Sequence, residues 1–340
     1  MARLRVGIAG GSGYTGAELL RLCASHPDLE VVLATGDSQA GARTADVYPS
    51  LAAAYPDLVY SAYEPTLFDG LDLAFLALPH GTSQTIVPDL RKRVGRIVDL
   101  AADFRLKDPS LYPEWYHAEH VAPELLSEFA FGIPELFRSD LVGAELIAAA
   151  GCYVTAASLA LAPLLRAGAI EATGIVVDAA SGVSGAGKAP KPHLHFPTLN
   201  EDFSAYGLLD HRHTPEIEQA IGGQVIFTPH LAPMTRGILA TCYARPTAGA
   251  GSSDPLTLLR DFYADEPFVV VSDTPPSTKA AFGSNTAHLT ARYDERTGWV
   301  LVLCALDNLV KGASGQAVQC ANLALGLDEA AGLPLAGTFP

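Results

Sequence analysis

One cysteine lies where an apolar, strand-like run is expected to give way to a helix. Cys152 directly follows Gly151 at the end of that run, and a helical pattern continues from it through Leu165. A helix N-terminus offers unpaired backbone N–H groups and a positive dipole end, and both favour a thiolate. The position therefore predicts a nucleophile. The alternative interpretation is a small core residue packed among alanines.

Two histidines flank an arginine just before another expected helix. In the run 211–217, Thr214 is the expected N-cap and Pro215 the first helical residue. Side chains that immediately precede a helix can point into a cleft, where an imidazole can take up a thiol proton and later serve a reacting oxygen. His211 and His213 are therefore candidate acid/base groups, which the sequence alone does not separate. A structural role is the alternative.

A glycine-rich turn follows the first expected strand and precedes a helix. Its residues Gly11, Gly13 and Gly16 match the pattern G-x-G-x-x-G. Such glycines make a tight turn that lets a pyrophosphate approach the helix N-terminus, so the turn predicts dinucleotide binding. Asp37 follows the second expected strand and is typical of a carboxylate that binds the ribose of NAD. Ser38 can instead donate to a phosphate, which leaves the choice between NAD and NADP open.

Four further residues or segments offer cations or hydrogen bonds to a ligand. Arg105 ends the segment 99–105 after a strand and can hold a phosphate or carboxylate through two N–H groups. The run Ser181–Lys188 supplies hydroxyls, a flexible glycine backbone and a cation. Arg236 follows an apolar strand, and Asn308 can bond a carboxamide. A surface salt bridge is the alternative for Arg105, and a plain flexible loop is the alternative for the run Ser181–Lys188.

A thiolate and a nicotinamide cofactor in one protein indicate a specific chemistry. Attack of the thiolate on an activated acyl group gives a thioester. Hydride delivery to that thioester gives a thiohemiacetal, which collapses to an aldehyde. An imidazole would accept and donate the protons that these reaction steps require.

The elements that must position these groups form two patterns. The first 150 residues alternate short apolar runs with helical patterns, which predicts a doubly wound parallel Rossmann sheet. From about 170 to 310 the strands look longer and are joined by loops, which predicts an α+β domain with a largely antiparallel sheet. Residues 313–325 form an amphipathic closing helix, and 249–254 read as a surface loop. Expected strands are 5–9, 31–35, 73–78, 97–100 and 145–149 in the first part, and 174–179, 224–228, 238–244, 268–271, 287–293 and 300–305 in the second.

Composition excludes several classes of protein. The formal net charge of -15 argues against a nucleic-acid partner, which requires a basic face. The five cysteines have no metal-ligand spacing, so we expect a reduced protein without a zinc site. No apolar run approaches the roughly 20 residues that span a bilayer, and the first residues do not read as a signal peptide. These features predict a cytoplasmic protein with no membrane contact.

Eight segments in order resemble the N-acetyl-gamma-glutamyl-phosphate reductases of arginine biosynthesis, type 1, which are relatives of aspartate-semialdehyde dehydrogenase. The resemblance implies a first domain over 1–150, joined by a C-terminal helix at 311–340, and a catalytic and dimerisation domain over 151–310. The segments are 10–16, Leu78-Pro79-His80-Gly81, 102–105, 150–153, 181–188, 211–217, Thr235-Arg236-Gly237-Ile238 and 308–312.

The resemblance implies reduction of N-acetyl-L-glutamyl 5-phosphate by NADPH to phosphate and N-acetyl-L-glutamate 5-semialdehyde. It assigns the nucleophile to Cys152 and the acid/base to the pair His211 and His213. It further implies a homodimer or homotetramer acting on a small acyl phosphate. The implied substrate contacts are Arg105, Ser181, Lys188 and Arg236, and the implied NADP contacts are Gly11, Ser12, Gly13, Tyr14, Thr15, Gly16, Ser38, Pro79, His80, Gly182, Ser184, Gly185, Asn308 and Lys311.

This chain departs from the family pattern at three positions. Val154 stands where proline is common, Lys188 where arginine is common, and Asp37 where many members carry arginine. Two other functions compete with the leading one. A related reductase acts on aminoadipate phosphate attached to an acidic carrier protein, which a net charge of -15 would repel. A non-catalytic dinucleotide sensor with Cys152 as a redox-responsive thiol would not need the cluster of anion-binding residues.

Overall fold

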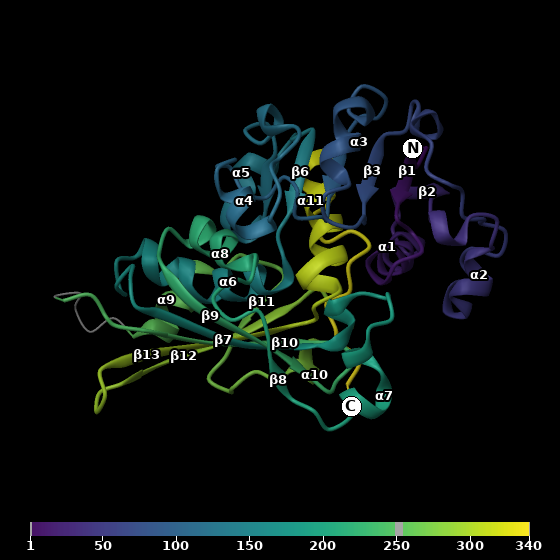
Figure 1. Cartoon of the computed structure of the whole chain (residues 1–340). Coiled ribbons are helices and arrows are strands. Elements are labelled where there is room, and N and C mark those ends of the chain that lie inside the picture. The colour runs from purple at the N-terminus through teal and green to yellow at the C-terminus, as the bar shows by residue number, and fades with distance from the viewer. Residues whose placement is uncertain (1, 249–253, 340) are drawn as a thin grey trace. The chain divides into compact units, whose positions relative to one another are not determined.

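The computed structural model describes residues 2–248 and 254–339 (Figure 1). The chain divides into two compact units. The first takes the residues up to Ala150 together with Ala313–Leu333, and the second takes Gly151–Gly312 with the residues from Pro334 onward. The polypeptide therefore passes between the units three times. The predicted surface loop at 249–254 lies outside the described residues, apart from Asp254.

The first unit contains a six-stranded sheet in the order β2-β1-β3-β4-β6-β5, in which every pairing is parallel. This confirms the doubly wound sheet expected from the alternating pattern. All four residues of β3 are buried, so both faces of the sheet are covered. The strands are β1 Leu4–Ala9, β2 Leu29–Ala34, β3 Leu73–Leu76, β4 Ile97–Asp99, β5 Ala130–Gly132 and β6 Leu146–Ala149.

Helices pack on this sheet from segments that are far apart in sequence. On one face, Ala74 and Leu76 of β3 share a core with Val87 and Leu90 of α3. Helix α11 packs on β4, β5 and β6 and contacts α1 and α5. The helices are α1 Tyr14–Ala24, α2 Thr44–Val47, α3 Ser83–Leu90, α4 Leu111–Tyr116, α5 Pro134–Leu141 and α11 Gly315–Leu325, with 3₁₀ helices η1 Asp37–Gln39, η2 Pro49–Leu51, η3 Pro65–Phe68 and η4 Pro123–Leu125.

The second unit contains a seven-stranded mixed sheet in the order β11-β12-β13-β10-β7-β9-β8. The pairs β11–β12 and β7–β9 are parallel and the other four pairs are antiparallel. The expectation of a largely antiparallel sheet is thus confirmed. The strands are β7 Ile175–Gly182, β8 Ser204–Ala205, β9 Val225–Ala232, β10 Ile238–Ala244, β11 Val269–Val271, β12 Ala287–Asp294 and β13 Trp299–Leu306.

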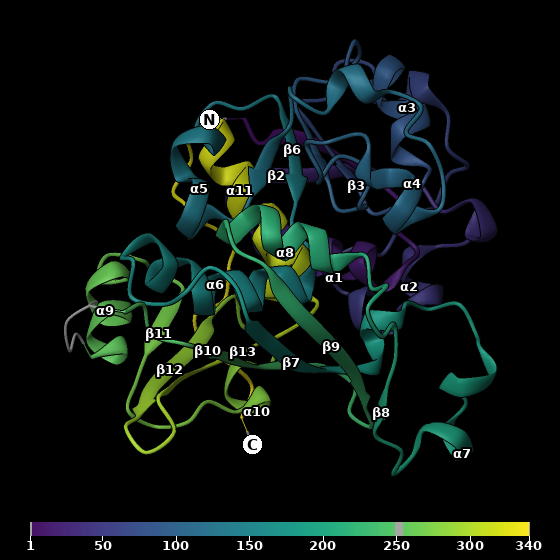
Figure 2. The same cartoon turned by 60° about the vertical axis from the view of Figure 1, so that its left-hand side comes forward.

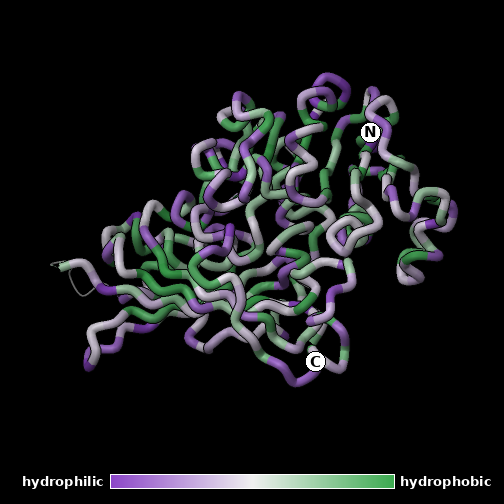
Figure 3. Tube along the Cα trace, viewed as in Figure 1, coloured by the Kyte–Doolittle hydropathy of each residue, from purple (hydrophilic) through white to green (hydrophobic). Residues whose placement is uncertain are grey.

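One face of this sheet carries the helices α6, α8 and α9, and the other face has partly exposed apolar residues. Helix α6 packs on β10 and β13, between α8 and α9 (Figure 2). On the other face Ile226, Tyr243 and Val270 are 55%, 39% and 40% exposed, and the tube in Figure 3 shows long hydrophobic stretches along these strands. The helices are α6 Cys152–Arg166, α7 Phe196–Leu199, α8 His213–Ile221, α9 Pro255–Phe262 and α10 Thr278–Ala281, with 3₁₀ helices η5 Val183–Ala186 and η6 Pro192–Leu194 and the π-helical turn η7 Val310–Ser314.

The C-terminal segment differs from the expected helix over 311–340. Helix α11 ends at Leu325, because Gly326 adopts a left-handed conformation with φ 68°. Residues beyond Leu333 return to the second unit, where the backbone N–H of Asn285 donates to Pro334 O at 2.8 Å and that of Thr338 to Phe282 O at 2.8 Å. The expectation that the whole of 311–340 joins the first unit is therefore wrong in its extent.

Candidate active site

Cys152 is the first residue of α6, as its sequence context predicts. Gly151 is the N-cap in an extended conformation, and its carbonyl accepts the backbone N–H of Thr155 at 2.9 Å. The thiol is partly exposed, whereas the other four cysteines are buried, and all five are free. Val154 lies fully buried in the first turn, so replacing the proline of the family pattern leaves the helix start at Cys152. The alternative of a buried core cysteine does not apply here.

Two tyrosines lie beside Cys152, and sequence reasoning missed both. The Tyr153 hydroxyl donates to His230 O at 2.9 Å, and the Tyr206 hydroxyl donates to the Tyr153 hydroxyl at 3.3 Å. Burial raises the pKa of Tyr206 to about 12, and the nearby Cys152 sulfur also acts to raise it. Burial likewise raises the pKa of Tyr153, again with a smaller contribution from Cys152. Both phenols therefore keep their protons, which they donate to His230 O and to the Tyr153 hydroxyl beside the thiol.

His211 and His213 lie side by side against these tyrosines. Their ring centroids are 4.8 Å apart, and the His211 ring lies edge-on to Tyr153, Tyr206 and Phe227. The backbone N–H of His213 donates to His211 Nδ1 at 3.1 Å, so the neutral His211 ring carries its proton on Nε2. Burial, followed by the positive charge of Arg212, lowers the pKa of His211 to about 4. His211 is therefore a neutral hydrogen-bond donor at neutral pH.

Helix α8 begins two residues earlier than expected. Its N-cap is Arg212 and its first residue is His213, so Thr214 and Pro215 are the second and third helical residues. The predicted N-cap role of Thr214 is wrong. The reason is that the His211 ring, and not a hydroxyl, accepts the first unpaired N–H of the helix.

The run Ser181–Lys188 is held by a neighbouring loop. Backbone N–H groups of Gly182, Val183 and Ser184 donate to the carbonyls of Gly237, Met234 and Thr235 at 2.8, 2.9 and 3.1 Å. These N–H groups are therefore occupied within the protein. Ser181 is buried, whereas Gly185 and Lys188 are exposed. The plain flexible loop is thus excluded for 181–184, and Lys188 retains an exposed cation.

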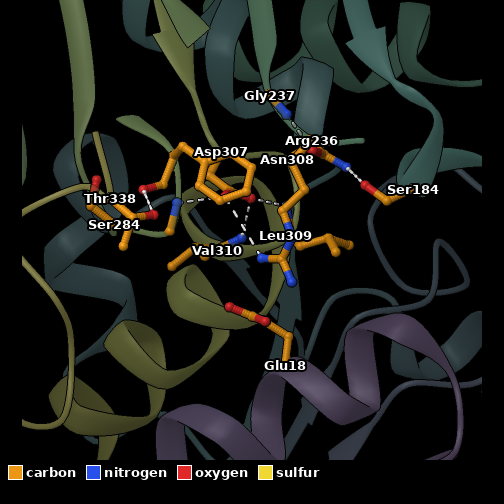
Figure 4. A network of polar contacts seen from close by, with 12 residues as sticks. Glu18, Ser184, Arg236, Gly237, Ser284, Asp307, Asn308, Leu309, Val310 and Thr338 are labelled. Carbon is orange, nitrogen blue, oxygen red and sulfur yellow. Dashed lines mark hydrogen bonds and ion pairs between the residues drawn. The ribbon is translucent and has the colours of Figure 1, made fainter. Parts of the chain in front are cut away.

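Asn308 ties this run to the loop that carries Arg236. Its Oδ1 accepts the Gly237 N–H at 2.7 Å and its Nδ2 donates to Ser184 Oγ at 2.9 Å (Figure 4). The predicted contact of Asn308 with a carboxamide must therefore use the second lone pair of Oδ1 or the second N–H of Nδ2. Lys311 is fully buried with its ammonium 5.7 Å from the centre of the Phe268 ring.

The glycine turn of the first unit has the close packing that dinucleotide binding requires. Gly10 has φ 82°, and a Cβ atom there would lie 2.3 Å from Ala77 O. A Cβ atom at Gly16 would lie 2.4 Å from Gly10 O, and Gly13 is the N-cap of α1. The Gly11 N–H donates to Thr35 O at 2.7 Å. The turn therefore sits at the carboxyl edge of the parallel sheet and at the N-terminus of α1, the place where a dinucleotide-binding fold receives a pyrophosphate.

The two residues expected to decide between NAD and NADP, Asp37 and Ser38, lie after β2. Asp37 begins η1, and its Oδ1 accepts the backbone N–H of Tyr63 at 2.9 Å. Asp37 and Ser38 are both exposed. A Cβ atom at Gly36 would lie 2.6 Å from Ser12 Oγ, so the glycine turn and the end of β2 are in close contact.

The loops after β3 and β4 are joined to one another. His80 Nδ1 accepts the backbone N–H of Ala102 at 2.9 Å, and Asp103 accepts that of Gly81 at 2.7 Å. Arg105 is only 5% exposed and donates from Nη2 to Leu100 O at 2.7 Å. The surface salt bridge proposed as its alternative is therefore excluded. Beside it, burial raises the pKa of Asp99 to about 7.

The structure thus brings together, within the second unit, Cys152, the two histidines, Tyr153 and Tyr206. Arg105 and the glycine turn belong to the first unit. Among the residues described, no group of His, Cys, Asp and Glu side chains has the arrangement of a metal site. No helix in the described ranges is long and apolar enough to cross a membrane.

Comparisons with known proteins agree with this two-unit fold. Residues 5–144 match the family of semialdehyde dehydrogenase NAD binding domains, and residues 152–308 match the semialdehyde dehydrogenase dimerisation domain. The solved structure of aspartate semialdehyde dehydrogenase II complexed with ASA from Vibrio cholerae shares the fold, with a TM-score of 0.71 and 16% identity over 96% of this chain and 99% of that one.

Two curated relatives match at much higher identity. A protein of Symbiobacterium thermophilum named N-acetyl-gamma-glutamyl-phosphate reductase is 49% identical over 98% of both chains. A protein of Desulforudis audaxviator with the same name is 48% identical over 99% of this chain and 100% of its own. On this evidence the chain belongs to the N-acetyl-gamma-glutamyl-phosphate reductase family.

Proposed function

We propose that this protein reduces N-acetyl-L-glutamyl 5-phosphate to N-acetyl-L-glutamate 5-semialdehyde and phosphate, with NADPH, in arginine biosynthesis. The observation that carries the proposal is Cys152 at the N-terminus of α6, partly exposed beside the His211, Tyr153 and Tyr206 cluster. The names of relatives at 49% and 48% identity support the substrate.

The reaction needs a nucleophile, a proton donor and an anion site from this chain. The Cys152 thiolate attacks the acyl carbon, the C–O bond to phosphate breaks, and phosphate leaves with the bonding electrons. NADPH held at the glycine turn would supply the hydride that the thioester carbonyl requires. The acid/base histidine takes the hydroxyl proton of the thiohemiacetal as the C–S bond breaks, which releases the aldehyde and regenerates the thiolate.

The pair His211 and His213 donates and accepts the protons that these steps require. Because His211 presents Nε2–H, it is suited to donate to an oxygen that gains negative charge during attack on the acyl carbon. The protonated phenols of Tyr153 and Tyr206 donate to His230 O and to the Tyr153 hydroxyl, so these bonds fix both rings at this place. Which of His211 and His213 is the acid/base is decided by the pH experiment described in the Discussion.

The remaining predicted roles follow from charge and position. Arg105, Ser181, Lys188 and Arg236 are the proposed contacts for the substrate's phosphate and carboxylate. The glycine turn with α1 is suited to the pyrophosphate of the cofactor. We propose NADP as the preferred cofactor, with the other predicted contacts being Ser38, Pro79, His80, Gly182, Ser184, Gly185, Asn308 and Lys311.

The open face of the seven-stranded sheet suggests how the protein assembles. Apolar residues such as Ile226 and Tyr243 alternate there with residues buried under α6 and α8. A partly exposed apolar face of this kind favours association. We propose a homodimer, or a homotetramer built from it, that acts in the cytoplasm.

The proposed function is tested by running the reaction in reverse. The wild-type protein should reduce NADP with N-acetyl-L-glutamate 5-semialdehyde only when phosphate is present. Cys152→Ser should bind NADP and lose turnover, whereas Cys242→Ala, which changes a buried cysteine of the same unit, should keep it. Near wild-type turnover in Cys152→Ser would exclude the covalent route.

A substrate panel separates the competing functions. Acetylglutamyl phosphate, aspartyl phosphate and carrier-linked aminoadipate phosphate should be compared in the forward direction. Preference for the carrier-linked compound would identify the alternative reductase. NADP binding without turnover on any of the three would identify a dinucleotide sensor.

A further inference from the structure

A buried carboxylate at the end of β13 has no place in the mechanism described so far. Asp307 is 0% exposed, and its Oδ1 accepts the backbone N–H groups of Leu309 at 2.8 Å and Val310 at 3.2 Å. Its Oδ2 accepts the N–H of Gly283 at 2.8 Å. The carboxylate is therefore locked in one orientation by three backbone donors (Figure 4).

The same Oδ2 faces the guanidinium of Arg236. The distance from Oδ2 to Nη1 is 3.7 Å, and the Arg236 side chain is 23% exposed. The guanidinium carbon also lies 6.0 Å from the centre of the Phe282 ring. One part of the guanidinium is thus turned toward the protein, while another part remains accessible to solvent. A guanidinium has five N–H donors in a rigid plane, so holding one edge fixes the direction of the others.

The backbone of Arg236 is held equally closely. A Cβ atom at Gly182 would lie 2.7 Å from the Arg236 backbone N, so the two loops are in direct contact. Residues on either side of Arg236 are bonded as well, since the Thr235 carbonyl accepts from Ser184 and the Gly237 N–H donates to Asn308. Backbone and side chain are therefore both oriented before any ligand binds.

We infer that Asp307 is a positioning residue that holds Arg236 in the orientation that binds the substrate's phosphate group. The inference rests on the proposed function, in which Arg236 is an anion contact. A negative charge beside the anchor lowers the net positive charge offered to phosphate. In return, the N–H donors of Arg236 are already oriented, so phosphate binding does not have to pay the entropy of ordering a flexible side chain.

The experiment measures inorganic phosphate in the reverse reaction with the full chain. Asp307→Asn keeps the size of the side chain but replaces one oxygen by an NH₂ group that cannot accept from Gly283 and repels Arg236. We expect KM for phosphate to rise about tenfold, equivalent to about 1.4 kcal/mol, with a smaller change in kcat. The rate of Cys152 alkylation by iodoacetamide should stay unchanged.

A double-mutant cycle tests whether Asp307 acts through Arg236. Arg236→Met should also raise KM for phosphate, and adding Asp307→Asn to it should change KM no further. Asp273→Asn removes a carboxylate from the same unit, at a surface pair with Arg260, and should leave KM for phosphate unchanged. Additive effects in the cycle, or an unchanged KM in Asp307→Asn, would overturn the inference.

Arg236→Lys keeps the inference testable if Asp307→Asn does not fold. A lysine keeps the charge and loses the planar fork, so KM for phosphate should rise nearly as much as in Asp307→Asn. Full retention of phosphate affinity in Arg236→Lys contradicts the positioning role. If the wild-type protein has no reverse activity, the proposed function fails, and the same variants are then compared by calorimetric titration with inorganic phosphate.

Discussion

The backbone of Gly312 lies directly against Cys152. A Cβ atom at Gly312 would be 2.8 Å from the Cβ of Cys152 and 3.2 Å from its Cα. Gly312 belongs to the π-helical turn η7, and its N–H donates to Asp307 O at 2.9 Å. A turn that is itself bonded to the end of β13 thus sets the position from which the sulfur projects.

Gly312→Ala should displace the nucleophile. The added methyl group meets atoms next to the backbone of Cys152, which cannot rotate away as a side-chain tip can. We expect kcat to fall about tenfold, together with a change in the rate of Cys152 alkylation. Gly326→Ala is the matched control, since its left-handed φ of 68° costs about 1 kcal/mol of stability while nothing lies within 4 Å of the new methyl group. Equal kinetics in the two variants would contradict this prediction.

The pH dependence of activity should separate the two histidines. Burial lowers the pKa of His211 to about 4, so His211 is neutral throughout the range where an ordinary histidine titrates. If His211 is the acid/base, the acid limb of the kcat/KM profile should lie near pH 4. His211→Asn and His213→Asn should then be compared at pH 7. The variant with only a modest loss of turnover is not the acid/base.

His211 also makes stability depend on pH in a defined window. Because its pKa falls from about 6.5 unfolded to about 4 folded, the unfolded state binds more protons between these values. Its contribution to stability is therefore present above pH 6.5 and is lost as the pH falls toward 4. Denaturant unfolding between pH 5 and 7 should show a shallower pH dependence in His211→Asn than in the wild type. Identical slopes would show that His211 is not the source.

Asp99 makes stability depend on pH in the opposite direction. Burial, followed by the nearby Asp103, raises its pKa from 3.8 to about 7. The folded state thus binds the proton more tightly, and the stability gained from the protonated form is lost as the pH rises through 7. Asp99→Asn imitates the protonated carboxyl and leaves Oδ1 to accept from Ser83 and Ala101. Its Tm relative to wild type should be about 2 °C higher at pH 8 than at pH 5.5. A Tm difference that does not change with pH would contradict the assignment.

Cofactor preference should respond to Asp37. The exposed carboxylate lies at the end of β2, where it would repel a 2′-phosphate. Asp37→Ser should raise the ratio of kcat/KM for NADP over NAD by about tenfold. Asp69→Asn, which removes a carboxylate elsewhere in the first unit, should not change that ratio. An unchanged ratio in Asp37→Ser would show that its hydrogen bond to Tyr63 directs the carboxylate away from the ribose.

The sequence predicts the long elements of the fold better than the short ones. Apolar runs found β10 with both ends correct and placed the other central strands within a few residues. The strands β5 and β8 have three and two residues, and they were not predicted. They lie at the edges of their sheets, where the pairing partner and not the local pattern decides whether a strand forms.

The candidate site also has features that the local sequence predicts and features that it does not. The position of Cys152 at a helix N-terminus follows from local signals, and the structure confirms it. The Tyr153–Tyr206 pair joins residues 53 positions apart, and the Asn308–Gly237 bond spans 71 positions. No local pattern encodes such contacts. For the same reason the start of α8 was misplaced, because its first N–H is accepted by a histidine ring that no N-cap preference anticipates.

The triple passage of the chain between its two units has a consequence during synthesis. When residues 1–312 have left the ribosome, β4, β5 and β6 still lack α11. The second unit still lacks the C-terminal segment that makes hydrogen bonds with the backbone of Asn285 and Phe282. Neither nascent unit has all of its contacts until the remaining segments arrive, so neither can complete its folding before the other has been synthesised. A fragment ending at Ala150 would expose the sheet surface that α11 covers and would aggregate, even though it carries the whole glycine turn.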